Sequence, residues 1–377
     1  MKKQQYIPVI VLRGCKSIIS RIRDIPVLFS SGIINEESCF PELPRKSKIA
    51  RSFQLLWFLL RHGEILWQYN LYGLDVKPFN AIEEYIGNKE LLWREYKYNV
   101  LMTKEDYTNV LRDKRLFFLF LKANGFNTPS VYAYTNRGQV FPFGWLLTNE
   151  SRAQDVLLPS DLLRKAGFYF CKPFDGVCGR GAFSLRVDGN ISINGKTVDM
   201  DSAIEFITSA FEDNYIIQEV LIQHPIMSSL HGCSVNTIRI NTAKNKTNGK
   251  IEFVTGFLRI GGGASVTDNM AGGGMAIGID FETGFLKHYG YYYDGKKSRR
   301  IERHPSLDIP FDTIQIPHLN EAVQACIDLH ERLPYLQFVG WDVAITDESV
   351  SFIEGNDNPE LSQSNHGPMR YVIDRYI

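Results

Sequence analysis

The amino-acid sequence predicts an α+β fold in which antiparallel hairpins are separated by single helices. Two hairpins are indicated by apolar residues that alternate on either side of a tight turn, Asp188-Gly189 in the first and Asn248-Gly249 in the second. A third is predicted near the end of the chain, where residues 338–346 and 350–354 are joined by a short turn. Strands that pair as hairpins form antiparallel sheets, so we do not expect a doubly wound parallel sheet.

The first 95 residues are expected to form a mainly helical N-terminal region. Leu, Trp, Tyr and charged residues dominate it, glycines are few, and apolar residues recur at helical spacing. Leu56, residues 58–60 and residues 66–67 are predicted to form broad apolar helix faces. No catalytic pattern occurs here, and the aromatic residues are interpreted as packing residues.

Clear element boundaries begin after this region. Asp113 is the expected N-cap of a helix that Asn124-Gly125 ends, which places Lys114 in the first helical turn. The further predicted elements, in chain order, are a buried strand at 168–174, a helix at 201–211 behind Asp201, a strand at 215–222 and a helix at 320–333.

Composition excludes several classes of protein. The 377 residues carry 42 basic and 42 acidic side chains, so no overall charge favours nucleic acid. The six cysteines are dispersed without a C-x-x-C pair, which indicates neither a zinc site nor a disulfide framework and fits a reducing compartment. No apolar run approaches the roughly 18 residues of a membrane span. We therefore expect a cytoplasmic protein with no integral membrane segment.

The beginning of the chain differs from this balance. Its first 51 residues contain ten Lys or Arg and four acidic residues. Such an excess could support weak peripheral contact with the inner face of an anionic membrane. A solvated basic face is the simpler interpretation.

A glycine-rich loop follows the predicted strand that contains Lys172. Its glycines are Gly176, Gly179 and Gly181. Glycines let backbone N–H groups approach an anion closely, and Lys172 and Arg180 add positive charge. A flexible turn between two strands is the alternative interpretation.

Three oxygen-bearing side chains are predicted to converge in the last hairpin. Asp342 lies on its first strand, whereas Glu354 and Asn356 share one face of its second strand. Carboxylate and amide oxygens suit Mg²⁺, which often shares its coordination with substrate phosphates. Polar residues at strand ends are also common turn formers, and that alternative stays open.

Two more features point to a nucleotide. The strand end formed by Gln218, Glu219, Val220 and Leu221 offers backbone groups for an adenine edge and apolar side chains for its ring. Lys114, at the start of a helix, could direct its positive charge toward the same nucleotide, or could be an ordinary exposed lysine.

The order of these motifs resembles the ATP-grasp superfamily. The shared run is Asp113-Lys114, Cys171-Lys172-Pro173, Gln218-Glu219, Gly340-Trp341-Asp342 and Glu354-Gly355-Asn356. More narrowly, the chain is similar to the ATP-grasp branch associated with sugar transfer and polysaccharide gene sets, over about residues 100 to 370. That similarity is carried by residues 234–239, 258–261, 268–269, 272–274, 279–280 and 304–305.

The resemblance implies two α+β subdomains that hold ATP between antiparallel sheets. Residues 96–221 would carry the glycine-rich flap and the hinge, and residues 222–377 the metal- and acceptor-binding part. Lys114 and Lys172 match the lysines that hold ATP phosphates, and the loop 175–181 matches the flap over the triphosphate.

The remaining matches concern the base and the metal. Gln218, Glu219, Val220 and Leu221 match the hinge that lines adenine. Asp342, Glu354 and Asn356 match the ligands of two Mg²⁺ ions, which Mn²⁺ could replace, with Glu354 between the ions.

Two positions depart from the pattern of related enzymes. Some ligases carry an arginine where this chain has Gly340, so Arg239 or Arg259 would have to supply that charge. Many relatives have an acidic residue for the ribose where this chain has His224-Pro225. The acceptor is expected to contact Arg239, Arg259, Asn269, the Gly272–Gly274 loop and His304.

The activity that the resemblance implies is an ATP- and Mg²⁺-dependent carboxylate–amine or carboxylate–hydroxyl ligase working through an acyl phosphate. Its substrates would be a small carboxylate, such as an amino acid, and a sugar or glycan-linked acceptor in cell-surface polysaccharide biosynthesis. The same cations would serve a phosphotransferase acting on a sugar hydroxyl. A nucleotide-binding module without turnover is the third alternative.

Overall fold

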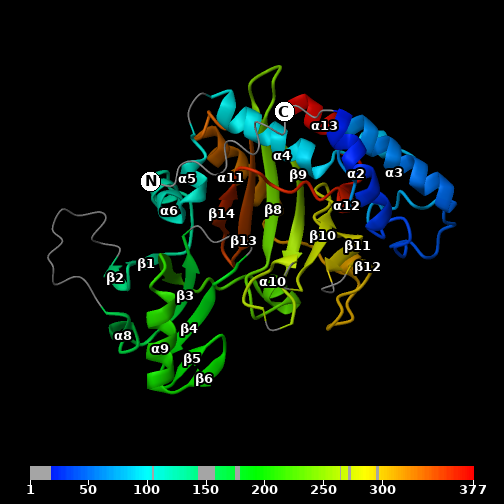
Figure 1. Cartoon of the computed structure of the whole chain (residues 1–377). Coiled ribbons are helices and arrows are strands. Elements are labelled where there is room, and N and C mark those ends of the chain that lie inside the picture. Colours follow the sequence, from blue (N-terminus) through cyan, green and yellow to red (C-terminus); the bar gives the residue numbers. More distant parts are fainter. Residues whose placement is uncertain are drawn as a thin grey trace.

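The computed structural model describes residues 18–103, 106–142, 158–174, 179–263, 265–270, 273–293 and 297–377. Figure 1 shows the elements in order along the chain. The α-helices are α2 (Ile18–Ser30), α3 (Lys48–His62), α4 (Asn88–Tyr96), α5 (Asn109–Arg112), α6 (Lys114–Ala123), α8 (Pro159–Leu162), α9 (Met200–Ala210), α10 (Pro225–Leu230), α11 (Leu319–Glu331), α12 (Gln363–His366) and α13 (Arg370–Tyr376). Shorter helical turns are η1 (Ile82–Glu84), η2 (Lys97–Leu101) and η5 (Phe311–Thr313).

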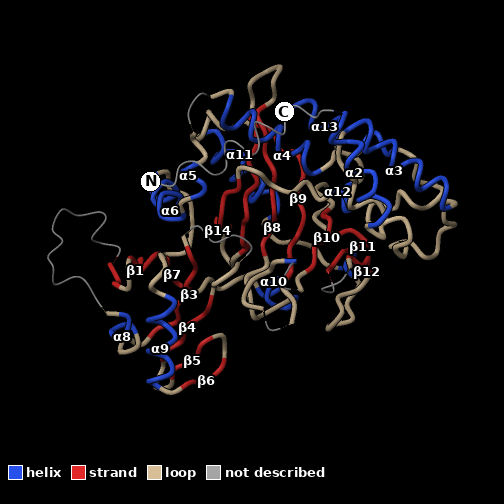
Figure 2. The backbone as a smooth tube through the Cα atoms, viewed as in Figure 1, coloured by secondary structure: helices blue, strands red, loops and turns tan. Residues whose placement is uncertain are grey.

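The described strands, red in Figure 2, form two seven-stranded sheets. All the paired strands are antiparallel. The first sheet has the order β2-β1-β7-β3-β4-β5-β6, with β1 (Val131–Asn136), β2 (Gln139–Pro142), β3 (Gly167–Pro173), β4 (Phe183–Val187), β5 (Ile191–Ile193), β6 (Lys196–Val198) and β7 (Tyr215–Glu219). The second has the order β12-β11-β10-β9-β8-β13-β14, with β8 (Thr237–Lys244), β9 (Ile251–Ile260), β10 (Met275–Ile279), β11 (Leu286–Tyr293), β12 (Ser298–Ile301), β13 (Phe338–Ile345) and β14 (Val350–Asn356). The predicted α+β class is confirmed.

Strand β13 shows how the second sheet orients its side chains. Trp341 is fully buried, with its ring centroid 6.3 Å from that of Phe117 on α6 and 6.1 Å from that of Phe352 on β14. Because successive side chains of a strand point to opposite faces, Asp342 is directed away from this core. The packing of one residue therefore orients the next residue toward the space between the sheets.

Helix α6 begins where the sequence predicted. Asp113 is its N-cap, and the Asp113 carboxylate accepts the backbone N–H of Arg115 at 2.9 Å. The apolar side of α6 buries Phe117 and Leu121 against the second sheet. Lys114 consequently starts the helix beside β14.

Two predicted boundaries are wrong by a few residues. Helix α9 is capped by Asp199 and not by Asp201, because Asp199 Oδ1 accepts the Ser202 N–H at 2.8 Å. Strand β7 ends at Glu219 and not at residue 222, since its neighbour β3 pairs with it only as far as Tyr169↔Glu219. Beyond that point the chain leaves the first sheet, and the His224 N–H donates to the Ile345 carbonyl of the second.

The N-terminal region is mainly helical, as predicted. Leu55, Phe58 and Leu59 of α3 are buried in a core of their own with Leu28 of α2. Residues 66–67 do not continue the helix as expected, because Gly63 ends it in the left-handed conformation (φ 72°). In the part of the chain that the structure describes, no helix is long and apolar enough to span a membrane.

Candidate functional site

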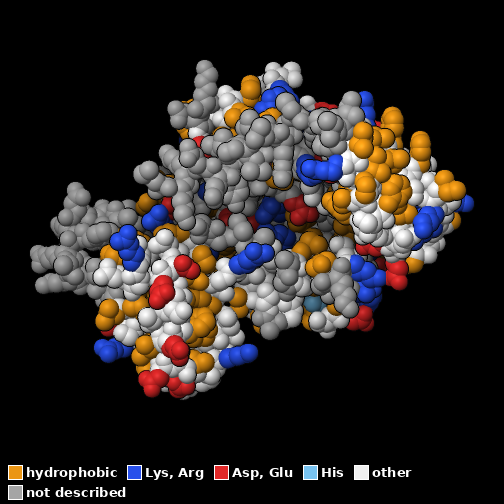
Figure 3. Space-filling view, in the orientation of Figure 1, with side chains coloured by type: hydrophobic (Ala, Val, Ile, Leu, Met, Phe, Trp, Pro, Cys, Tyr) orange, Lys and Arg blue, Asp and Glu red, His pale blue; other side chains and the backbone are white. Residues whose placement is uncertain are grey.

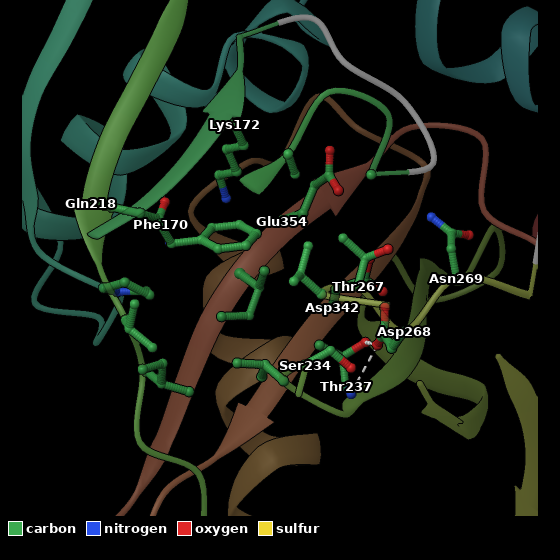
Figure 4. Close-up of a pocket in the computed structure, with 18 of the residues that line it drawn as sticks. Phe170, Lys172, Gln218, Ser234, Thr237, Thr267, Asp268, Asn269, Asp342 and Glu354 are labelled. Atoms are coloured by element: carbon green, nitrogen blue, oxygen red, sulfur yellow. Dashed lines mark hydrogen bonds between the residues drawn. The ribbon is translucent and has the colours of Figure 1, made fainter. Parts of the chain in front are cut away.

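A cavity of about 640 Å³ lies between the two sheets, beside the segment that crosses from one to the other (Figure 4). It brings together most of the side chains predicted from the sequence. The predicted residues that line it are Lys114, Lys172, Gly179, Arg180, Gln218, Glu219, Val220, Leu221, Arg239, Arg259, Asn269, Asp342, Glu354 and Asn356. Gly181 is not among the lining residues, and its carbonyl accepts the Tyr215 hydroxyl at 2.9 Å. Gly176 lies outside the described residues.

One end of the cavity is apolar. Strand β3 was predicted to be buried, but only its Tyr169 and Cys171 side chains point into the core of the first sheet. Phe168 and Phe170, on the other face, line the cavity, and Figure 4 shows the Phe170 ring projecting into it near Lys172. The alternation of the strand could have indicated Phe170 as a site residue, which the sequence analysis missed.

The crossing segment forms a second wall of this apolar end. It starts from Glu219, the last residue of β7, which is anchored to Ser130 just before β1. The Glu219 carboxylate accepts the Ser130 N–H at 2.7 Å, and the Glu219 N–H donates to the Ser130 carbonyl at 2.9 Å. Val220 and Leu221 then run along the cavity. A planar apolar ring would fit between this segment and Phe170, with backbone polar groups at its edge.

Positive charge gathers beside the apolar end. The Lys114 ammonium group donates to the Phe174 carbonyl at 3.2 Å and lies 3.3 Å from Glu354 Oε1. Burial lowers the pKa of Lys172 to about 8; the nearby Glu354 carboxylate opposes that shift and Lys114 adds to it. Together with the exposed Arg180, these groups form a cationic wall suited to an anion of several charges.

Because of its lowered pKa, Lys172 is expected to make anion binding depend on pH. An anion prefers the ammonium form, which is lost as pH rises through about 8. Affinity for ADP should therefore fall by roughly tenfold between about pH 7 and about pH 9. Calorimetric titration at both values tests this, with Lys172→Arg as the control, because an arginine stays charged and should remove most of the pH effect. An unchanged pH dependence in that variant would assign the effect to another group.

The three predicted oxygen-bearing side chains converge through strand register. Asp342 on β13 is the cross-strand partner of Glu354 on β14, and Asn356 Nδ2 lies 3.5 Å from Asp342 Oδ2. Directly opposite residues of an antiparallel pair have their Cβ atoms roughly 5 Å apart. The three side chains therefore face one part of the cavity.

Asp342 is also held by two arginines of the second sheet. Arg239 donates to both its oxygens, at 2.5 and 3.0 Å, and Arg259 donates to Oδ2 at 2.9 Å. Burial opposes ionisation of Asp342, but the two guanidinium groups outweigh it and hold its pKa below the ordinary value. The carboxylate is thus ionised and oriented by its neighbours.

The sequence analysis missed Asp268 as a site residue. Its carboxylate pairs with Arg259 at 2.7 Å and accepts the Thr237 N–H at 3.0 Å, and it lines the cavity. Burial raises its pKa despite the attraction of Arg259. The only feature of the sequence that pointed to Asp268 was its place in the motif Asp268-Asn269, where an aspartate is usually interpreted as a turn residue. Arg259 therefore links two buried carboxylates, Asp268 and Asp342.

Gly340 explains why Arg239 lies where it does. A Cβ atom at Gly340 would come within 2.3 Å of the Pro359 side chain and 3.1 Å of Arg239 Cδ. A longer side chain has no room there, since the stem of Arg239 passes beside Gly340. A guanidinium group consequently approaches this part of the cavity from β8 instead of β13.

The side chains of Asp342, Glu354 and Asn356 can be compared with the ligands that a magnesium ion prefers. Glu354 and Asn356 present oxygens to the cavity, and Asp342 Oδ1 accepts one hydrogen bond, from Arg239, which leaves it further acceptor capacity. Such oxygens match the preference of Mg²⁺. These residues therefore fit the ion, with Asp342 shared between it and the arginines.

Other predicted contacts fall outside the cavity or outside the described residues. His304 is buried, but it does not line the cavity, and its Nδ1 accepts the N–H groups of Ser306 and Leu307 at 3.3 Å. Gly272 lies outside the described residues, and Gly274 has no room for a Cβ atom against the Asp268 carbonyl. His224 caps α10, where its Nδ1 accepts the Ile226 N–H.

Comparison with known sequences places this arrangement in a family. The sequence profile described as sugar-transfer-associated ATP-grasp matches residues 94–367. No curated protein sequence matches the chain.

Several solved structures resemble the chain at low identity. D-Alanine–D-alanine ligase from Helicobacter pylori is 12% identical with a TM-score of 0.38, over 72% of this chain and 59% of the ligase. N5-carboxyaminoimidazole synthetase from Staphylococcus aureus, complexed with ADP, is 10% identical with a TM-score of 0.38, over 74% of this chain and 53% of that protein. L-Amino acid ligase from Bacillus licheniformis is 11% identical with a TM-score of 0.35, over 71% of this chain and 48% of the ligase. The chain thus spans about half the length of these proteins, and TM-scores this low carry no conclusion about function.

Proposed function

Since this chain belongs to the sugar-transfer-associated ATP-grasp family, we propose that it is an ATP- and Mg²⁺-dependent ligase that joins a small carboxylate to a sugar or glycan-linked acceptor. The observation that supports this most is the meeting of Lys114, Lys172 and the Asp342–Glu354 pair around one cavity. The proposed boundary between the two parts of the ATP-grasp region, 96–221 and 222–377, is supported by the segment that crosses from the first sheet to the second.

The nucleotide would occupy the apolar end and the cationic wall. Adenine would lie between Phe170 and the backbone of Val220 and Leu221. The phosphates would face Lys114, Lys172 and Arg180, which lie beside this end. This order leaves the γ-phosphate near Asp342, Glu354 and Asn356, where charge must be balanced for phosphoryl transfer.

Asp342, Glu354 and Asn356 would hold Mg²⁺, which, when bound, neutralises charge on the transferring phosphoryl group. Arg239 and Arg259 orient Asp342 and place two guanidinium groups beside the same oxygens. We assign to Arg239 the charge that other ligases obtain from the position of Gly340. Pre-oriented charges of this kind need no rearrangement during the reaction.

The reaction would proceed in two steps. A carboxylate oxygen attacks the γ-phosphorus, the bond to the β-phosphate oxygen breaks, and ADP leaves. The acceptor amine or hydroxyl then attacks the acyl carbon, inorganic phosphate leaves, and the acceptor's proton passes to solvent or phosphate. The walls of the cavity would keep water from the acyl phosphate between these steps.

Product analysis tests the ligase. Release of ADP and inorganic phosphate should require both a carboxylate and an amine- or hydroxyl-bearing sugar, and hydroxylamine should trap the acyl phosphate as a hydroxamate. A matched control is Glu348→Ala, an exposed residue in the turn of the β13–β14 hairpin, which should leave turnover unchanged. ADP release without any carboxylate would contradict the proposal.

One observation favours a phosphotransferase as the second candidate. Among the described residues, Ser234, Thr267 and Asn269 line the cavity beside Asp268, and the guanidinium groups of Arg239 and Arg259 are engaged by carboxylates. Hydroxyl and amide groups of this kind suit a neutral, hydroxyl-bearing substrate. A stable phosphorylated sugar, with no inorganic phosphate and no hydroxamate, would identify this activity.

A further inference from the structure

Helix α3 exposes an apolar stripe on the side opposite its buried face. Ile49 is 82% exposed and Phe53 68% exposed, and Trp57 and Leu60 continue the stripe at helical spacing. Its buried residues, Leu55, Phe58 and Leu59, already fill the core of the N-terminal region. The stripe is therefore a second apolar side of α3 that the fold leaves open.

Helix α2 extends this surface. Ile22 and Phe29 are exposed on one side of α2, whereas Leu28 is buried on another side. The Arg21 guanidinium donates to the Leu60 carbonyl at 2.6 Å, which joins α2 to the end of α3. Figure 3 shows apolar side chains gathered over these two helices. We call this surface the α2–α3 apolar face, made of Ile22, Phe29, Ile49, Phe53, Trp57 and Leu60.

The two helices that carry this face are basic in a chain whose net charge is zero. They contain five basic residues, of which Arg51 is buried, and one acid, Asp24. Arg23, Lys48 and Arg61 are exposed. Of the two acids of the neighbouring turn η1, Glu83 is engaged by the Trp57 indole N–H and lies 3.2 Å from His62 Nε2, and Glu84 is exposed.

We propose that the α2–α3 apolar face docks on an anionic lipid surface. Neither helix contributes a residue to the lining of the cavity, and both precede the family match at residues 94–367, so the face is separate from the cavity. Bulky Ile, Phe, Trp and Leu side chains flanked by Lys and Arg are typical of helices that lie in a membrane interface. The basic groups select a negatively charged surface, which distinguishes this occupant from a neutral protein face.

Docking would bring the cavity to substrates held at a membrane. Apolar side chains would enter the boundary between headgroups and acyl chains, while the lysines and arginines contact the phosphates. Binding should therefore need both apolar contact and negative lipid, and it should weaken as salt screens the charges.

The experiment is co-sedimentation of the full chain with vesicles. One set contains phosphatidylglycerol and phosphatidylethanolamine in equal amounts, and the other contains phosphatidylcholine alone. The wild type should bind the anionic set, and Ile49→Ser combined with Phe53→Ser should weaken that binding by at least roughly tenfold. Leu158→Ser combined with Met200→Ser is the control, because these residues are exposed apolar positions at the starts of α8 and α9, which Figure 1 places far from α2 and α3.

The other outcomes are equally informative. Failure of the wild type to bind anionic vesicles would overturn the proposal, as would equal loss in the control variant. A wild-type dimer in gel filtration that Ile49→Ser with Phe53→Ser converts to a monomer would assign the face to a second copy of the chain. Melting curves of both variants should match the wild type, since every replaced side chain is exposed.

Discussion

Glu354→Ala is expected to reduce ATP turnover by at least about a hundredfold while leaving the protein folded. The Glu354 side chain faces the cavity and is a third exposed, so its removal takes away a proposed metal donor without opening the core. Its ion pair with Lys114 contributes at most about 1 kcal/mol to stability, because solvent reaches the carboxylate. The measurements are ADP release under saturating ATP and a urea unfolding curve.

The controls for this variant separate charge from shape. Glu354→Gln keeps the size of the side chain but loses its charge, and it should be nearly as inactive as Glu354→Ala. Glu348→Ala, at the turn of the same hairpin, should retain full turnover. Turnover that survives in Glu354→Ala would contradict the role proposed for Glu354, whereas ATP binding without ADP release in the wild type would favour a nucleotide-binding module without catalysis.

Asp342→Ala is expected to destabilise the fold by about 3–5 kcal/mol, unlike the Glu354 variants. The Asp342 side chain is only 5% exposed and is the partner of both Arg239 and Arg259. Its loss leaves Arg239 buried without its carboxylate, whereas Arg259 keeps Asp268. Urea unfolding monitored by tryptophan fluorescence measures the change.

A control and a rescue make this prediction specific. Asp347→Ala, in the exposed turn of the same hairpin, should change the free energy of unfolding by less than about 0.5 kcal/mol. Combining Asp342→Ala with Arg239→Met should recover part of the loss, because the unpaired buried charge is then removed. A fully stable Asp342→Ala protein would mean that the two arginines find other partners.

Much of the fold could be predicted because its signals are local. Asp113 caps α6 through its own carboxylate, and the Asp188-Gly189 turn joins β4 to β5. Alternation along β13 separates Trp341 from Asp342, so the sequence also predicted which face of the last hairpin carries polar groups. These features depend on residues within a few positions of one another.

Parts of the site could not be predicted, because they join residues far apart in the chain. Asp268 is a turn residue by its sequence, and it becomes a site residue because the loop after β9 brings its carboxylate to the Thr237 N–H of β8, 31 positions away, as well as to Arg259. Gly340 was expected to leave a charge missing, but its lack of a side chain makes space for the stem of Arg239. No local pattern contains either relation.

The local pattern of apolar and polar residues was enough to predict the class of fold, the three hairpins and the residues that meet across the last of them. Three-dimensional packing was needed to pair Arg239 and Arg259 with Asp342, and to show which of two apolar sides of α3 remains exposed. The reason is physical: a strand or helix period assigns side chains to faces, but burial and ion pairing depend on which distant segment covers each face.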